Sequence, residues 1–211
     1  DTGSVTTMAK ITVGLDIGFS SIKVVSLSKD NGPFKLVSLG AIASPQPGIL
    51  TDNDNDLEIL ANSIKQLLTA TRIDTRDVIV ALPESRVFTR VIDDLPYLTD
   101  NELSSAIRYA AEEFIPMALA DVNLNWQVLV RSSGKEKNTR TVVLVIASPK
   151  NVVAKYIKVL DMAGLHPKVM ETEIIAVTRS LVGNNPFSPS TLIVQLGTTT
   201  TDFAAVSKGL I

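Results

Sequence analysis

The stretch that most constrains the fold is Lys10 to Leu27, with the sequence KITVGLDIGFSSIKVVSL. Apolar residues alternate with other residues on both sides of the turn DIGFSS, and a period of two residues is typical of β-strands. The stretch therefore predicts two antiparallel strands joined by a short polar turn, which is a β-hairpin.

The turn of this hairpin has residue types that suit a phosphate group. Gly18 lets the backbone approach a ligand because it has no Cβ, and Ser20 and Ser21 offer hydroxyl and backbone N–H donors. Lys23 adds a positive charge, and Asp16 could hold a hydrated Mg²⁺, which takes only one or two carboxylates. An ordinary hairpin with a polar tip would carry the same residues, so this segment alone leaves both interpretations open.

A second segment, Thr191 to Val206, repeats this design. Its sequence TLIVQLGTTTTDFAAV contains an apolar strand, a glycine, a run of hydroxyl residues and another apolar strand. Two such hairpins in one chain favour a nucleotide held between two phosphate-binding turns. Because an isolated hairpin is unstable, the second one is expected to pack on the first domain, to pair with another chain or to swap with one.

The two turns and the residues between them resemble a known family. DIGFSSIK resembles the first phosphate loop of the actin, Hsp70 and FtsA superfamily of ATPases, and LGTTTTD resembles the second. The segments 87–129, with its LPYLTDNEL and FIP, and 146–181 are similar to the PilM family of type IV pilus assembly proteins. The resemblance covers nearly the whole chain after Met8. It implies an α/β actin-like fold with an α+β insertion, and a second actin-like domain that is mostly absent.

The resemblance implies roles for the residues of the first turn. Asp16 corresponds to the acid that organises a metal-bound water, so it is the candidate Mg²⁺ residue. Lys23 corresponds to the lysine that contacts phosphate, and Gly18, Ser20 and Ser21 belong to the loop that binds ATP. A solvated turn acid and an exposed strand lysine are the structural alternatives.

The second turn is implied to bind the same nucleotide. The family's second phosphate loop corresponds to Gly197, Thr198, Thr199 and Thr200. Glu173 corresponds to the residue that positions the attacking water and is the candidate catalytic residue, while Glu171 leaves the register open. Either acid would also suit the first turn of a helix on structural grounds. Gln195 departs from the pattern, because many of these ATPases have Asp there to bind Mg²⁺ through water, so metal-assisted hydrolysis is expected to be weak.

The resemblance further implies a cytoplasmic scaffold of the type IV pilus platform, at the inner face of the bacterial inner membrane. It would bind ATP with Mg²⁺ when intact and would be at most a weak ATPase. It would dock the N-terminal cytoplasmic tail of a PilN-like membrane protein in a groove between the core and the insertion. An FtsA-like cell-division ATPase and a GspL-like domain of type II secretion are the alternatives. A sugar or acetate kinase would need a substrate pocket that no segment supplies.

Composition excludes several other functions. The chain has 211 residues, 45% apolar and 20% charged, which indicates a packed core in one large domain or two small ones. It has no cysteine and one histidine, so disulfides, thiolate catalysis and His-rich metal sites are not expected. A net charge of −2 with scattered Lys and Arg gives no reason to expect a nucleic-acid partner. No apolar run is long enough for a transmembrane span, and no segment has the pattern of a signal peptide.

The first domain, an actin-like core, is expected from residues 8–83 and 148–185. Residues 1–7 resemble an expression-vector remnant and do not enter this expectation. After the first hairpin, the patterns predict a strand at 34–43, a helix at 56–72 and a strand at 77–82 that is buried on both faces. These elements fit the ribonuclease-H-like core of actin-like proteins.

The inserted subdomain is expected from residues 84–147 in the order β-α-β-β. One helix, capped by Thr99 or Asp100 and ending near Phe114, should cover three strands. The predicted strands are 86–95, 123–131 and 139–147, the last two joined by the polar loop 132–138.

The elements after the insertion are expected to return to the first core. Pro149 should start a helix that Gly164 ends. The predicted bounds are a helix at 151–163, a strand at 167–170 and a helix at 173–182. The turn-rich segment 184–190 should connect the domains, and residues 190–211 should be the first hairpin of the second actin-like domain.

Overall fold

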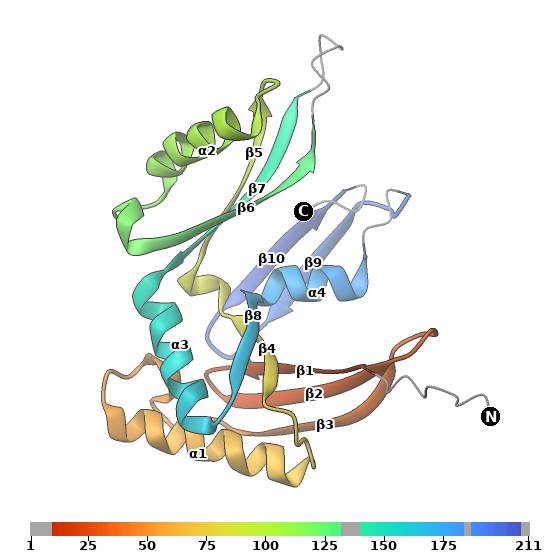
Figure 1. Cartoon of the computed structure of the whole chain (residues 1–211), viewed down its shortest axis with the longest axis vertical. Coiled ribbons are helices and arrows are strands. Elements are labelled where there is room, and N and C mark those ends of the chain that lie inside the picture. The colour runs from red at the N-terminus through yellow and green to blue at the C-terminus, as the bar shows by residue number, and fades with distance from the viewer. Residues whose placement is uncertain (1–9, 132–139, 184–186, 208–211) are drawn as a thin grey trace, which may run out of the picture. The chain divides into compact units, whose positions relative to one another are not determined.

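The computed structural model describes residues 10–131, 140–183 and 187–207. They form two compact units (Figure 1), and each is described by itself. The first contains the residues up to Leu82 together with Lys155–Glu171, and the second contains Pro83–Ala154 and the residues from Thr172 onward. The predicted loop at 132–138, residues 1–7 and the first part of the connection at 184–190 lie outside the described residues.

The first unit is built on a five-stranded sheet with the order β3-β2-β1-β4-β8. The strands are β1 (Lys10–Ile17), β2 (Ser21–Lys29), β3 (Lys35–Ala43), β4 (Asp77–Leu82) and β8 (His166–Thr172). β1 and β2 pair antiparallel, β2 and β3 pair antiparallel, and β1 pairs parallel with β4. The predicted hairpin, the third strand and the α/β core are thus confirmed.

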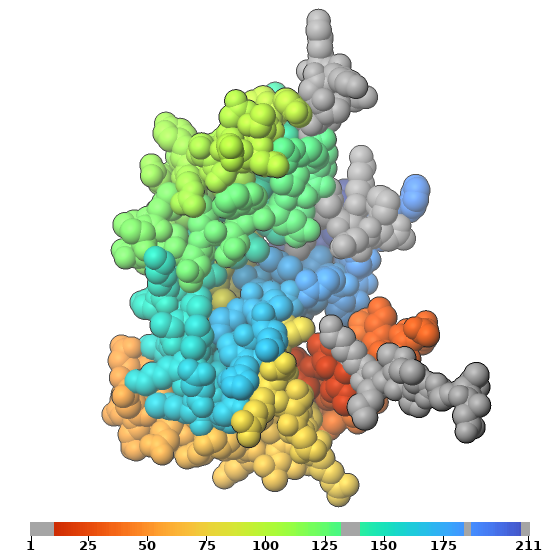
Figure 2. Space-filling model, in the orientation of Figure 1, coloured from red at the N-terminus to blue at the C-terminus, as the bar shows by residue number. Residues whose placement is uncertain are grey.

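Two helices cover one face of this sheet. They are α1 (Asp54–Ala70) and α3 (Lys150–Ala163), whose residues from Lys155 belong to this unit. Lys155 and Lys158 form salt bridges with Asp52 and Asp54 at the start of α1, and Figure 2 shows the two helices side by side. The apolar side chains of α1 recur at helical spacing and are buried: Leu57, Leu60, Ala61, Ile64, Leu67 and Leu68.

The burial of β4 differs from the prediction. Val78, Val80 and Leu82 are at most 2% exposed, whereas Ile79 and Ala81 are only partly buried. The apolar run suggested burial on both faces, but α1 and α3 lie together and fully cover only one of them.

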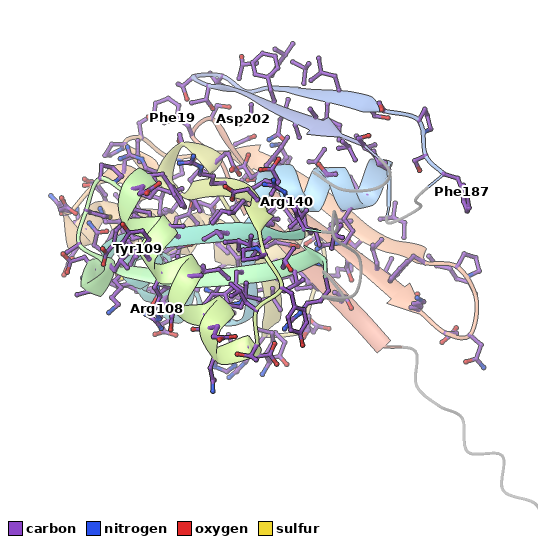
Figure 3. All side chains as sticks on the ribbon, turned by 90° about the horizontal axis from the view of Figure 1, so that it is seen from above. Phe19, Arg108, Tyr109, Arg140, Phe187 and Asp202 are labelled. Carbon is purple, nitrogen blue, oxygen red and sulfur yellow. The ribbon has the colours of Figure 1, made fainter. Side chains whose placement is uncertain are left out.

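The insertion in the second unit has the predicted order β-α-β-β. Its strands β5 (Phe88–Leu95), β6 (Val122–Val130) and β7 (Thr141–Pro149) form an antiparallel sheet with the order β5-β7-β6. Helix α2 (Asp100–Phe114) buries Leu103 and Ile107 against this sheet, while Arg108 and Tyr109 lie on its outer side (Figure 3). Pro149 pairs with Val122 as the last residue of β7, so α3 begins one residue later than predicted.

Three short 3₁₀ turns complete the described structure: Gly48–Leu50, Glu84–Arg86 and Leu119–Asp121. Gly164 ends α3 with a φ of +75°, as its predicted role as C-cap requires. Among the described residues, no helix has both the length and the apolar character that crossing a membrane requires.

The start of α2 gives a pH-dependent prediction. Thr99 and Glu102 form a capping box, in which the Thr99 hydroxyl and backbone N–H donate to the Glu102 carboxylate and lower its pKa. A lowered pKa stabilises the fold above the ordinary pKa and loses this effect as pH falls through the lowered value. Glu102→Gln should therefore lower the urea midpoint at neutral pH, and the difference from wild type should vanish in acid. Glu112→Gln, exposed on the same helix, is the control; equal losses in acid and at neutral pH would contradict the prediction.

Helix α4 packs on the C-terminal hairpin. α4 (Glu173–Leu181) buries Ile174 in a cluster with Ile193, Ala204 and Val206 of strands β9 (Thr191–Leu196) and β10 (Thr201–Val206). The sequence assigned this helix to the first core, because its periodicity marks an apolar face without identifying the sheet that the face meets. Of the three ways expected to stabilise the hairpin, packing within the chain is observed. Self-association through it and the proposed three-part division of the chain stay predictions.

Candidate functional site

The first glycine turn closes tightly between β1 and β2. The Gly18 N–H donates to the Ser21 carbonyl oxygen at 3.0 Å. A Cβ added at Gly18 would lie 2.9 Å from the same oxygen, which is closer than real Cβ atoms approach. Only glycine therefore fits this turn without a shift in the backbone. Gln46 also holds the tip, because its side-chain amide donates to the Phe19 carbonyl oxygen at 2.8 Å.

Asp16 and Lys23 lie directly opposite each other where β1 and β2 meet this turn. The Lys23 ammonium donates to Asp16 Oδ2 at 2.9 Å. The other oxygen of the carboxylate, Oδ1, is buried and has no hydrogen-bond partner among the described residues. The sequence predicted both residues at this turn but did not predict that they pair with each other.

The second glycine turn has the same geometry in the second unit. The Gly197 N–H donates to the Thr200 carbonyl oxygen at 2.9 Å, and a Cβ at Gly197 would lie 3.0 Å from that oxygen. Gln195 stands two residues before the glycine, as Asp16 does in the first turn. Its cross-strand partner is Asp202 (Figure 3), which occupies the position of Lys23. The predicted repeat is therefore a repeat of structure as well as of sequence.

Glu173 meets the second turn through Gln195. The Gln195 Nε2 donates to Glu173 Oε2 at 2.7 Å in a partly buried hydrogen bond. Glu173 is the first residue of α4, where the helix dipole favours a negative charge. Gln195 Oε1 is buried without a hydrogen-bond partner among the described residues, as Asp16 Oδ1 is in the first turn.

The candidate residues divide between the two units. Asp16, Gly18, Ser20, Ser21 and Lys23 share the first turn. Glu173 lies beside the second turn, which contains Gly197, Thr198, Thr199 and Thr200. Sequence reasoning missed the bond between Glu173 and Gln195, whose only signal is that position 195 repeats position 16.

A metal ion fits the described residues poorly. Mg²⁺ prefers carboxylate oxygens and water in near-octahedral geometry. No group of three or more Asp, Glu, His or Cys residues within 10–131, 140–183 and 187–207 could hold a metal ion. Asp16 is already paired with Lys23, and the equivalent residue of the second turn is the uncharged Gln195.

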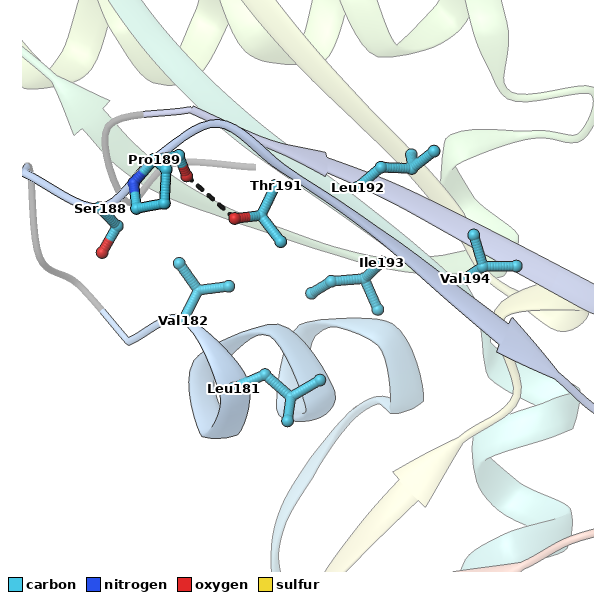
Figure 4. Close-up of a pocket in the computed structure, with 8 residues that line it drawn as sticks. All are labelled: Leu181, Val182, Ser188, Pro189, Thr191, Leu192, Ile193 and Val194. Atoms are coloured by element: carbon cyan, nitrogen blue, oxygen red, sulfur yellow. Dashed lines mark hydrogen bonds between the residues drawn. The ribbon is translucent and has the colours of Figure 1, made fainter.

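A pocket of about 420 Å³ lies at the opposite end of the second hairpin from its glycine turn (Figure 4). Its walls are the end of α4, at Leu181 and Val182, and the start of β9 with the segment before it. Most of its side chains are apolar, and the Thr191 hydroxyl donates to the Pro189 carbonyl oxygen. None of the candidate phosphate-binding residues lines it.

Comparison with known proteins identifies the family. The family model described as type IV pilus assembly protein PilM matches residues 14–211. The chain belongs to the PilM family. The described fold agrees, since the solved structure of a PilM–PilN type IV pilus biogenesis complex matches 93% of this chain with a TM-score of 0.78 and 28% identity. The PilM match also favours this family over the FtsA-like and GspL-like alternatives.

More distant relatives share the fold with the PilM family. The cytoplasmic domain of EpsL, from the type II secretion system of Vibrio cholerae, matches 93% of the chain with a TM-score of 0.57 and 16% identity. The cell division protein FtsA of Enterococcus hirae is 23% identical and is matched by 88% of the chain. The chain spans 58% of the matched PilM chain, 71% of the EpsL domain and 46% of FtsA.

Proposed function

We propose that the intact protein is a nucleotide-binding scaffold of the type IV pilus platform. The observation that carries this proposal is the repeated turn, in which Gly18 and Gly197 each donate to a carbonyl three residues later and leave no room for a Cβ. A turn free of side-chain bulk lets backbone N–H groups reach phosphate oxygens. Two such turns suit the two sides of an ATP polyphosphate.

The side chains around the turns have distinct proposed roles. Lys23 contacts a phosphate oxygen, and the hydroxyls of Ser20, Ser21, Thr198, Thr199 and Thr200 donate to others. Glu173 orients water near the terminal phosphate. Mg²⁺ that arrives with the nucleotide would neutralise phosphate charge, and Asp16 Oδ1 is the buried acceptor that suits one of its water ligands. The hydrogen bond from Gln195 restrains Glu173, so slow turnover is expected at most.

Nucleotide titration of the full-length protein tests this proposal. A fluorescent ATP analogue should bind saturably, and unlabelled ATP should displace it. GMP, which has a single phosphate, is the control and should compete poorly, because it cannot span two phosphate-binding turns. A well-folded sample that binds no ATP would rule out the nucleotide role.

We further propose that the insertion docks the N-terminal cytoplasmic tail of a PilN-like membrane protein, at the cytoplasmic face of the inner membrane. β5 is an edge strand of its sheet among the described strands, because the order is β5-β7-β6. An extended peptide can add to such an edge through main-chain hydrogen bonds. The similarity to a PilM chain that was solved in complex with PilN supports this choice of partner.

The charge of β5 gives a prediction for docking. Asp93 and Asp94 are exposed near the end of this strand, and an N-terminal tail carries a positive α-amino group. Reversing both charges with Asp93→Lys and Asp94→Lys should weaken binding of the tail peptide about tenfold, because two exposed attractions become repulsions. The measurement is a fluorescence-anisotropy titration with the labelled peptide.

The matched control carries Glu112→Lys and Glu113→Lys, which make the same change in charge at exposed positions of α2. This control should bind the peptide with wild-type affinity. An equal loss in both variants would show that only net charge matters and would exclude a site on β5.

A further inference from the structure

The two glycine turns differ in charge at equivalent positions. Two residues before the glycine, the first turn has the carboxylate of Asp16 and the second has the neutral amide of Gln195. Each side chain has one buried oxygen without a hydrogen-bond partner among the described residues. The same register position thus presents an acceptor in both turns, and only one of these acceptors is charged.

Each turn balances its charge with the protein's own side chains. In the first turn, the Lys23 ammonium lies 2.9 Å from Asp16 and neutralises it. In the second, the Gln195 amide donates to Glu173 at 2.7 Å and so satisfies the carboxylate directly. Asp202, the cross-strand partner of Gln195, is partly exposed to water.

An acid at position 195 would change this balance. Its carboxylate would stand within about 4 Å of the Glu173 carboxylate, and two like charges at that separation need a shared proton or a cation between them. The amide removes this requirement, because it donates a hydrogen bond where a second carboxylate would repel.

We propose that Gln195 makes nucleotide binding by this protein nearly independent of divalent cations. Gln195 is a positioning residue: its amide takes the place that a cation would occupy beside Glu173. The inference rests on the proposed nucleotide-binding function and specifies the cation requirement of the same site.

The test is titration of the full-length protein with a fluorescent ATP analogue, in buffer with Mg²⁺ and in buffer with EDTA. We expect the wild-type affinity to differ by less than about threefold between the two buffers. Gln195→Asp should lose about tenfold or more in EDTA and recover in Mg²⁺, because the added charge stands close to Glu173 and to the phosphates. Thermal unfolding without nucleotide is a second readout: Mg²⁺ should raise the melting temperature of Gln195→Asp and leave that of the wild type unchanged.

Gln127→Asp is the matched control, since it adds the same charge at an exposed position of β6 in the same unit. It should behave as the wild type in both buffers. A wild-type protein that binds in Mg²⁺ and loses tenfold or more in EDTA would overturn this inference and leave the proposed function intact. A protein that binds in neither buffer would overturn both. The wild-type comparison needs no variant and decides the question even if Gln195→Asp does not fold.

Discussion

Gly18→Ala is expected to weaken nucleotide binding about a hundredfold while the β1–β2 hairpin stays folded. The added Cβ would lie 2.9 Å from the Ser21 carbonyl oxygen, so the turn must open. Opening moves the backbone N–H donors away from the phosphate. A hydrogen bond to a charged group contributes about 1.5–3 kcal/mol, and a loss near 3 kcal/mol corresponds to about a hundredfold in affinity. Gly197→Ala should act in the same way, because its Cβ would lie 3.0 Å from Thr200.

Gly32→Ala is the control for this prediction. Gly32 lies in the loop before β3, and a Cβ there would have no atom within 4 Å. The control should keep wild-type nucleotide affinity in the same fluorescence titration. If Gly18→Ala bound nucleotide as well as Gly32→Ala does, the first turn would have no part in the phosphate site.

Ile64→Ala is expected to destabilise the first unit by about 2–5 kcal/mol, since it deletes buried apolar atoms and leaves a cavity. Ile64 is 0% exposed on the face of α1 that packs on the sheet. A loss of this size is a large part of the total stability of about 5–15 kcal/mol that is typical of a domain. Urea unfolding followed by far-UV circular dichroism measures it.

Ile59→Ala makes the same substitution on the same helix at a position that is 47% exposed. It should change the stability by no more than about 0.5 kcal/mol. Trp126, the only tryptophan of the chain, lies beside the core of the insertion. Its fluorescence therefore reports unfolding of the second unit. Equal losses for Ile59→Ala and Ile64→Ala would contradict the assigned faces of α1.

Local patterns account for the parts of the fold that the sequence predicted. The alternation in KITVGLDI and SIKVVSLS determined the β1–β2 hairpin, because a period of two leaves one strand face apolar. The spacing from Leu57 to Leu68 determined α1, and Thr99 with Glu102 determined where α2 begins. The glycine in each turn was identifiable because it stands between an apolar strand and a run of hydroxyl residues.

The candidate site was predictable as two separate turns and no further. The sequence placed Asp16, Lys23 and Glu173 near these turns through the family resemblance. It did not reveal that Lys23 neutralises Asp16, since facing positions become known only when the register of β1 on β2 is known. A difference of one residue in that register would have turned one of the two side chains to the other face.

The sequence by itself therefore determined the hairpins, the helices, the two glycine turns and the family. Only the tertiary structure decided that α4 packs on β9 and β10, and that Gln195 binds Glu173 across 22 residues of sequence. The physical reason is that periodicity and turn chemistry are local properties of the chain. They show which face of an element is apolar, whereas the partner of that face depends on how distant elements pack together.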